Sequence, residues 1–225
     1  MVVWAGAAAC AAALGAVPFA GGRRPPLAGI GWANALAAGL MLGASYILIM
    51  LGLDRSPVAA AGGALLGIAF VALAHAVTGP EGTRVFVRNS LHAAPEGMAI
   101  GGAMAVDLPF GAFMALAIAV HNVPEGAALS AALTGRGLGA VRAAVAAGAA
   151  KANQMLLAVA TYALVAGFPA LLPWALGGAA GAFLYLIMAD LLPESYRQAG
   201  RTSIGLVVAV AMAILVLLAR RVPLP

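Results

Sequence analysis

Two copies of one short motif place imidazole and carboxylate groups inside otherwise apolar stretches of the chain. Residues 92–97 and 121–126 both read His-x-x-Pro-Glu-Gly, and the two copies begin 29 residues apart. Histidine and glutamate at positions i and i+4 lie on one face of a helix. Imidazole and carboxylate together form a ligand set for a first-row divalent metal ion. The candidate metal ligands are therefore His92, Glu96, His121 and Glu125.

Each motif also carries a proline in the interior of a predicted helix. Proline has no backbone N–H, so Pro95 and Pro124 leave the carbonyls of Leu91 and Val120 without their helical partners. An unpaired carbonyl at membrane depth is tolerated where it lines a cavity. We therefore expect each motif to supply two ligands, a kink and a spare carbonyl oxygen.

A single lysine stands apart from the other basic residues. The chain has twelve basic residues, of which eleven are arginine, and Lys151 lies alone in a long apolar stretch. An ionisable group inside a membrane is costly and is a functional hypothesis by default. Two interpretations remain open for Lys151: a salt-bridge partner of Glu96 or Glu125, or a charge with a functional role.

Three further residues have two interpretations or a lesser role. Asp190 is either an anchor at a helix end or part of a transport pathway, and Met41 is either an apolar filler or a soft thioether ligand. We interpret His75, near the inner end of the third apolar segment, as an interfacial residue.

The composition excludes a water-soluble globular protein. The 225 residues are 64% hydrophobic and 8% charged, whereas soluble domains are about one quarter charged. The net charge of +5 does not argue for nucleic acid, because arginines beside membrane helices give the same balance. The single cysteine, Cys10, excludes an internal disulfide and any cysteine-based zinc or iron–sulfur site.

Eight apolar segments are long enough to cross a bilayer as helices, so we predict an all-α integral membrane protein with one transmembrane domain over 1–225. Their approximate bounds are 1–20, 32–53, 58–77, 89–106, 110–133, 139–165, 170–192 and 204–219. Loops after odd segments carry eight arginines, and the opposite side carries three (Arg55, Arg220 and Arg221). This bias predicts cytoplasmic odd loops and two extracytoplasmic termini. The eight are Arg23, Arg24, Arg84, Arg88, Arg136, Arg142, Arg197 and Arg201.

The spacing around one turn predicts the depth of the motifs. Glu96 comes eleven residues before Asp107, and His121 comes twelve after Pro109. At about 1.5 Å per residue both lie roughly 17 Å below the turn, near the midplane of a bilayer. The two motifs are therefore expected to face each other at one depth on an antiparallel hairpin. Lys151 is expected at a similar level.

On these residues the sequence resembles the ZIP (Zrt/Irt-like) family of divalent metal transporters, bacterial type. The duplicated motif carries the resemblance, and residues 181–195 look like the seventh helix of that family. The resemblance implies eight transmembrane helices, in which helices one to three and six to eight form an inverted repeat around helices four and five. It implies that His92, Glu96, His121 and Glu125 are the primary metal ligands, with Met41 near a methionine that joins this site in some members.

The same resemblance places a second metal beside the first in many members. Its ligands would fall at Ala93, Asn122 and Lys151, together with Glu96 and Glu125 as bridging groups. Here Ala93 supplies no ligand, and Lys151 stands where the sixth helix usually carries glutamate. A protonated amine cannot bind a metal. We therefore expect a mononuclear site in which the charge of Lys151 replaces the second metal.

The function implied is transport of a divalent metal, first of all zinc, into the cytoplasm across the inner (plasma) membrane. The metal would leave past Asp190 and Glu194. The ligand set does not select one metal, so Fe²⁺, Co²⁺, Ni²⁺, Cd²⁺ and Mn²⁺ stay open. The expected partners are the metal and the lipid bilayer, with a homodimer left open and no nucleic acid. The alternatives to a non-enzymatic transporter are a membrane metalloenzyme, for which the His-Glu-x-x-His motif is absent, a metal sensor, and a Schiff-base lysine protein.

Overall fold

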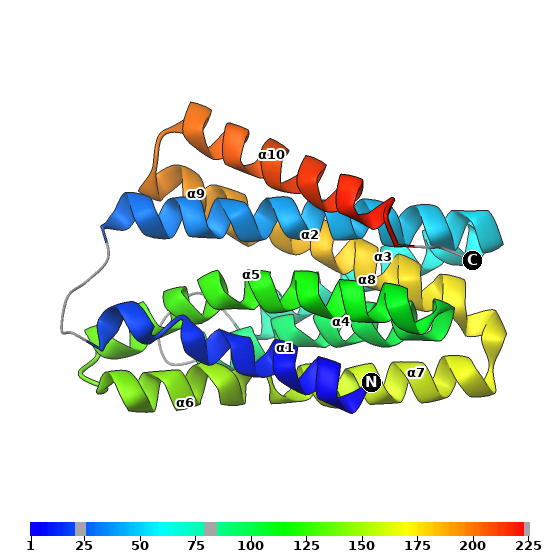
Figure 1. The fold of residues 1–225 in the computed structure, drawn as a ribbon, viewed down its shortest axis with the longest axis horizontal. Helices are drawn as coiled ribbons and strands as arrows, with labels where there is room; N and C mark the ends of the chain where they lie inside the picture. The colour runs from blue at the N-terminus through cyan, green and yellow to red at the C-terminus, as the bar shows by residue number, and fades with distance from the viewer. Residues whose placement is uncertain (21–25, 79–84, 223–225) are drawn as a thin grey trace.

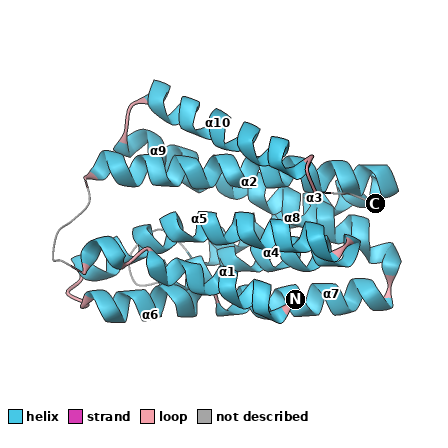
Figure 2. Cartoon of the chain, in the orientation of Figure 1, coloured by secondary structure: helices cyan, strands magenta, loops and turns pink. Residues whose placement is uncertain are grey.

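The computed structural model of the chain describes residues 1–20, 26–78 and 85–222, and every regular element among them is helical. Three of the arginines used to predict the orientation, Arg23, Arg24 and Arg84, lie outside the described residues. The helices are α1 (Val2–Leu14), α2 (Leu27–Arg55), α3 (Pro57–Thr78), α4 (Val85–Val106), α5 (Leu108–Gly135), α6 (Ala140–Ala150), α7 (Ala152–Gly167), α8 (Leu172–Leu186), α9 (Leu192–Gln198) and α10 (Arg201–Ala219). Figure 2 shows short loops between α4 and α5, between α5 and α6, and between α9 and α10.

Within the described residues, seven helical segments are long and apolar enough to cross a membrane. Two of these segments are built from consecutive helices, α6 with α7 and α8 with α9. The 22-residue α4 is the eighth long helix, and it falls outside this set because it carries the polar residues Arg88, Asn89, His92 and Glu96. The prediction of an all-α membrane protein is therefore confirmed.

Successive segments run in opposite directions, so that the start of α1 and the end of α10 both lie toward the right of Figure 1. The hairpin between α4 and α5 is sharp because Asp107 caps α5. Its Oδ1 accepts a hydrogen bond from the backbone N–H of Phe110 at 2.6 Å. This bond satisfies one of the free donors at a helix start. The cap fixes the register in which the two motifs meet.

The helix packing follows an inverted repeat. In the first half α1 packs on α5 and α3 packs on α8; in the second, α7 packs on α4 and α10 packs on α2. A two-fold relation that exchanges segments one to three with segments six to eight, and α4 with α5, converts the first two pairs into the last two. The same relation leaves the pair α4 with α5 and the pair α2 with α8 unchanged. The predicted arrangement of three, two and three helices therefore accounts for which helices touch.

The last residue of each motif brings two helices into backbone contact. A Cβ atom on Gly97 would lie 2.4 Å from the carbonyl oxygen of Gln154 in α7, and one on Gly126 would lie 1.8 Å from that of Ala12 in α1. Both distances are too short for any side chain. Small residues allow such close approach between membrane helices. The two glycines therefore seat α4 and α5, which carry the motifs, against the outer helices.

Candidate metal centre

A buried lysine joins the two motifs. The Nζ atom of Lys151 donates to Glu96 Oε1 at 2.5 Å, and it also donates to Glu125 Oε2. The side chains of Glu96 and Lys151 are 0% and 1% exposed, so both charges lie outside the reach of water. A buried carboxylate without a partner is strongly unfavourable. Lys151 therefore neutralises part of the charge that the two motifs place in the interior.

The backbone explains how a lysine reaches this position. The sixth apolar segment is not one continuous helix: α6 ends at Ala150, α7 begins at Ala152, and Lys151 lies at the break with φ −96° and ψ 5°. The sequence predicted one membrane segment over about 139–165, which corresponds to the candidate span Ala140–Gly167, and it did not predict a break within it. The break occurs at Lys151, the residue that forms ion pairs with Glu96 of α4 and Glu125 of α5. Ion pairing with two carboxylates offsets the helical hydrogen bonds lost there.

His121 completes the buried group. Its Nε2 atom lies 3.4 Å from Glu96 Oε1 and 3.6 Å from Glu125 Oε1. A tetrahedral zinc ion with bonds of about 2.0–2.1 Å separates its ligand atoms by roughly 3.3 Å. The three atoms therefore already stand near the spacing that one ion requires. His121 Nε2 and Glu96 Oε2 are buried and form no hydrogen bond within the described part of the chain.

His92 lies in a different group. Its Nε2 atom is 2.9 Å from His75 Nε2 and 3.5 Å from Asp190 Oδ2, while His75 Nε2 is 3.1 Å from the same carboxylate oxygen. The three residues come from α4, from α3 and from the segment after α8. The structure therefore separates the four sequence-predicted ligands: it brings Glu96, His121 and Glu125 together and places His92 with His75 and Asp190.

A wide helical turn places Asp190 in this second group. Residues Ile187–Leu191 form a π-helical turn between α8 and α9. Pro193, just beyond it, has no N–H to donate to the carbonyl of Ala189, so the usual i to i−4 pattern cannot continue. Such single wide turns are frequent at functional sites.

A cavity of about 220 Å³ lies beside both groups. Glu125 of the buried group and His92 and Asp190 of the second group are among its lining residues. Its other lining residues come from α2, α4, α5 and the segment around α9: Asn34, Asn89, Ala128, Leu129, Leu191 and Glu194. It lies toward the end of the bundle where α5 meets α6 and α9 meets α10, which is the predicted cytoplasmic end. The sequence-predicted pathway residues Asp190 and Glu194 therefore both line it.

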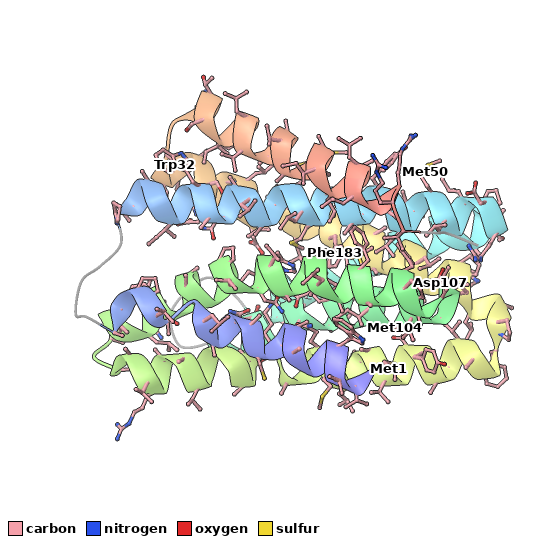
Figure 3. The ribbon with its side chains drawn as sticks, viewed as in Figure 1. Met1, Trp32, Met50, Met104, Asp107 and Phe183 are labelled. Carbon is pink, nitrogen blue, oxygen red and sulfur yellow. The ribbon has the colours of Figure 1, made fainter. Side chains whose placement is uncertain are left out.

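Apolar side chains fill the bundle on the other side of the buried group. Along α5 from His121 toward Asp107 come Ile118 and Met114, which are 2% and 0% exposed. Ile100 of α4 and Phe183 of α8 belong to the same buried core, and Figure 3 labels Phe183 in the middle of the bundle and Asp107 near its right-hand end. Met41 of α2, 1% exposed, also lies in this apolar core.

Asn122 has a structural use. Its amide nitrogen donates to the carbonyl oxygen of Ala8 at 2.7 Å and to Gln154 Oε1 at 2.9 Å, which ties α5 to α1 and to α7. Its Oδ1 atom is buried and accepts no hydrogen bond from the described residues. Glu194 is also engaged, because it pairs with Arg197 and accepts from Gln198 at 2.5 Å.

Sequence reasoning placed His75 at the interface and assigned it no partner. One signal could have found its role. His75 and Asp190 both lie near the predicted inner ends of their segments, and so does His92, which precedes Glu96 by one helical turn. The sequence therefore indicated that the three residues lie at a similar depth. It did not indicate which faces of α3, α4 and α8 turn toward one another, because packing between the helices determines this.

Sequence comparison finds known proteins that are similar to this chain. The model of the ZIP zinc transporter family matches residues 80–218. A putative zinc transporter of Arabidopsis thaliana is 32% identical over 226 residues, which cover 92% of this chain and 36% of that protein. The zinc transporter GufA of Myxococcus xanthus is 38% identical over 136 residues, 55% of this chain and 52% of that protein. The chain thus matches about one third and one half of the lengths of these relatives.

Proposed function

The chain belongs to the ZIP zinc transporter family, and from this premise we propose that it carries a divalent metal, zinc first of all, across a membrane into the cytoplasm. The observation that carries the proposal is the cavity that Glu125 of the buried group lines together with Asp190 and Glu194. A transport site needs a route as well as ligands. The family is one of transporters, which supports a function other than catalysis.

The proposed transport site consists of Glu96, His121 and Glu125, near the middle of the bundle. Support comes from the spacing of their ligand atoms, at 3.4 and 3.6 Å around His121 Nε2. Imidazole nitrogen and carboxylate oxygen are suitable ligands for zinc. His92 and Met41 remain candidate ligands of this site in another conformation, in which α2 and α4 shift relative to α5.

Lys151 is proposed to make the site mononuclear. Its Nζ atom donates to Glu96 Oε1, the oxygen that also faces His121, and to Glu125 Oε2. The other carboxylate oxygen of Glu125, Oε1, faces His121. Glu125 can therefore bind a metal through Oε1 and Lys151 through Oε2. Two carboxylates and one ammonium carry a charge of −1, so one divalent ion brings the site to +1 and a second ion is repelled.

The conformation is proposed to be inward-facing. The cavity lies on the predicted cytoplasmic side of the buried group, and the buried apolar side chains of Ile118, Met114 and Phe183 fill the other side. An ion cannot cross the apolar side without losing its hydration shell. Uptake then requires a second conformation in which these side chains separate and the cavity closes.

Metal flux into proteoliposomes tests the function. We expect zinc influx by the wild type and at least a tenfold loss in Glu125→Gln, with Fe²⁺, Mn²⁺ and Cd²⁺ compared under the same gradient. Ser130→Ala is the matched control, because Ser130 lies on the same helix, is 0% exposed, and its hydroxyl forms no hydrogen bond within the described residues. Absence of flux for every metal by the wild type would contradict transport.

The number of bound ions tests the role of Lys151. Replacing the ammonium with a carboxylate in Lys151→Glu adds a ligand and removes the repelling charge. We expect this variant to bind one zinc equivalent more than the wild type in equilibrium dialysis of the detergent-solubilised protein. Equal stoichiometry in the two proteins would contradict the mononuclear proposal.

A further inference from the structure

We propose that one acyl chain of a membrane lipid binds in an apolar cavity between α4, α7 and the pair α3 and α8. The cavity has a volume of about 410 Å³, and it shares no lining residue with the cavity beside Glu125. The inference goes beyond the proposed function and does not depend on which ion is carried or in which direction. It rests on the chemistry, the opening and the length of this second cavity.

The walls of the cavity are hydrocarbon. Phe70 of α3, Leu157 of α7 and Met98 of α4 are among the side chains that line it. Within the described part of the chain no charged side chain lines this cavity, and the hydroxyl of Thr161 is the only one in its lining. Cavities with apolar walls stay free of water and accept apolar molecules. The chemistry therefore selects hydrocarbon as the occupant.

The cavity opens on the surface that faces the bilayer. At its rim, Leu66, Phe70 and Leu164 are exposed, whereas Ala94 and Val165 in its lining are only 9% and 5% exposed. Apolar side chains exposed along a membrane-spanning helix contact lipid tails, which are as apolar as leucine. The cavity is therefore continuous with the lipid-facing surface of the protein, and the bilayer supplies the hydrocarbon that fits it.

The length of the cavity suits one leaflet. It extends along α7 from Leu157 to Val165 and along α3 from Gly63 to Phe70, which corresponds to roughly 11–12 Å at about 1.5 Å per residue. One leaflet of the hydrocarbon core is about 15 Å thick. Trp174 lines the cavity near the start of α8, at the predicted extracytoplasmic end, and tryptophan is enriched at the level of the headgroups. A lipid with its headgroup near Trp174 can therefore extend one chain toward the bilayer midplane.

The bound chain lies between helices that carry a motif and helices that do not. Ala94 and Met98 of α4 line the cavity on one side, and Gly178 of α8 lines it on another. A void at this position would deprive its lining of dispersion contacts. The flexible side chain of Met98 can adapt to an occupant of variable shape. The acyl chain therefore completes the packing between α4 and α8, and a movement of α4 relative to α8 changes the space available to it.

Quenching of tryptophan fluorescence by a brominated lipid tests the site. The probe is phosphatidylcholine with a 9,10-dibromostearoyl chain, added to full-length Trp4→Phe/Trp32→Phe protein in detergent, so that Trp174 alone reports. We expect quenching that saturates near one lipid per chain. A second protein retains Trp4 alone, because Trp4 is 44% exposed against 41% for Trp174 and does not line the cavity. Its quenching is expected to rise with the lipid fraction without saturating at this ratio.

A variant that fills the cavity separates binding inside it from contact at the surface. A Cβ on Gly178 would meet nothing nearer than the Cε of Met98 at 3.4 Å, so Gly178→Leu places its side chain in the cavity without a clash at the Cβ. We expect at least a threefold loss of the saturable quenching of Trp174. Gly205→Leu on α10 is the matched control, because its Cβ would meet nothing within 4 Å and Gly205 does not line the cavity.

Either of two results overturns the proposal: quenching of Trp174 that follows the same course as that of Trp4, or saturable quenching that a monodisperse Gly178→Leu protein retains in full. If Gly178→Leu is not monodisperse, competition replaces it. An equal amount of the unbrominated lipid, in excess detergent, should restore about half of the fluorescence lost at a saturable site. No recovery would overturn the proposal. Zinc flux is not a readout here, so a failure of transport leaves the result on lipid binding standing.

Discussion

His92 and His121 hold the same place in two copies of one motif, yet their Nε2 atoms belong to different clusters. His121 faces Glu96 and Glu125, whereas His92 faces His75 and Asp190. The helices are antiparallel, so the hairpin that aligns Glu96 with His121 aligns His92 with Glu125, one turn nearer the cavity. A duplicated motif thus contributes to two unlike clusters of ionisable side chains, one buried and one beside the cavity.

The first prediction concerns the glycine that ends the second motif. A Cβ on Gly126 would lie 1.8 Å from the carbonyl oxygen of Ala12, so Gly126→Ala must push α1 away from α5. Overpacking a well-packed core lowers the free energy of unfolding by roughly 1–3 kcal/mol, and we expect the effect of Gly126→Ala to lie at or above the upper end of that range. The midpoint of thermal unfolding in detergent measures it. Gly148→Ala is the control, because its Cβ would meet nothing nearer than 3.8 Å, and equal effects of the two changes would contradict the close contact.

The second prediction concerns Asn122 as a tie between helices. Asn122→Ala removes hydrogen bonds to the carbonyl of Ala8 and to Gln154 Oε1. A buried hydrogen bond contributes about 1 kcal/mol, and an unsatisfied partner costs about 1–3 kcal/mol. We therefore expect Asn122→Ala to unfold at a lower temperature than Ser130→Ala. A midpoint for Asn122→Ala at or above that of Ser130→Ala would contradict the structural use of this side chain.

Much of the fold could be predicted from the sequence, because a bilayer leaves few alternatives. Segments of about 20 apolar residues must be helical, and their even number places both termini on one side. The membership of the ZIP family, inferred from the repeated motif, is also confirmed. The break at Lys151 could not be predicted, because the apolar pattern continues on both sides of it and only the ion pairs with Glu96 and Glu125 explain it.

The site is less predictable than the fold. Residue types and spacing identified Glu96, His121, Glu125 and Lys151 as groups at one depth, and the structure places them in contact. That they bind metal stays a prediction. The separation of His92 from them depends on the rotation of α4 and on the wide turn that carries Asp190. Such rotations are fixed by packing between helices distant in sequence, which no local pattern encodes.

The third prediction concerns Lys151 as a stand-in for a cation. Lys151→Met keeps an unbranched side chain but leaves Glu96 and Glu125 without their ammonium partner. Removing one partner of a buried ion pair costs about 3–5 kcal/mol. We expect the metal-free variant to unfold at a markedly lower temperature than the wild type, and zinc to recover most of the difference. A metal-free Lys151→Met as stable as the wild type would contradict this role, and so would zinc without effect.

The fourth prediction concerns which side of the membrane reaches the cavity. The one native cysteine, Cys10, can be replaced by alanine, after which single cysteines report on access. Ala128 lines the cavity, whereas Ile118 on the same helix is 2% exposed on the apolar side of His121. We expect a membrane-impermeant thiol reagent to modify Ala128→Cys from the cytoplasmic side only, and to leave Ile118→Cys unmodified from either side. Zinc should slow the reaction of Ala128→Cys, because an ion bound at His92 or Glu125 obstructs the cavity. If Ile118→Cys were modified from outside and Ala128→Cys were protected, the protein would be outward-facing, and the proposed inward-facing conformation would be wrong.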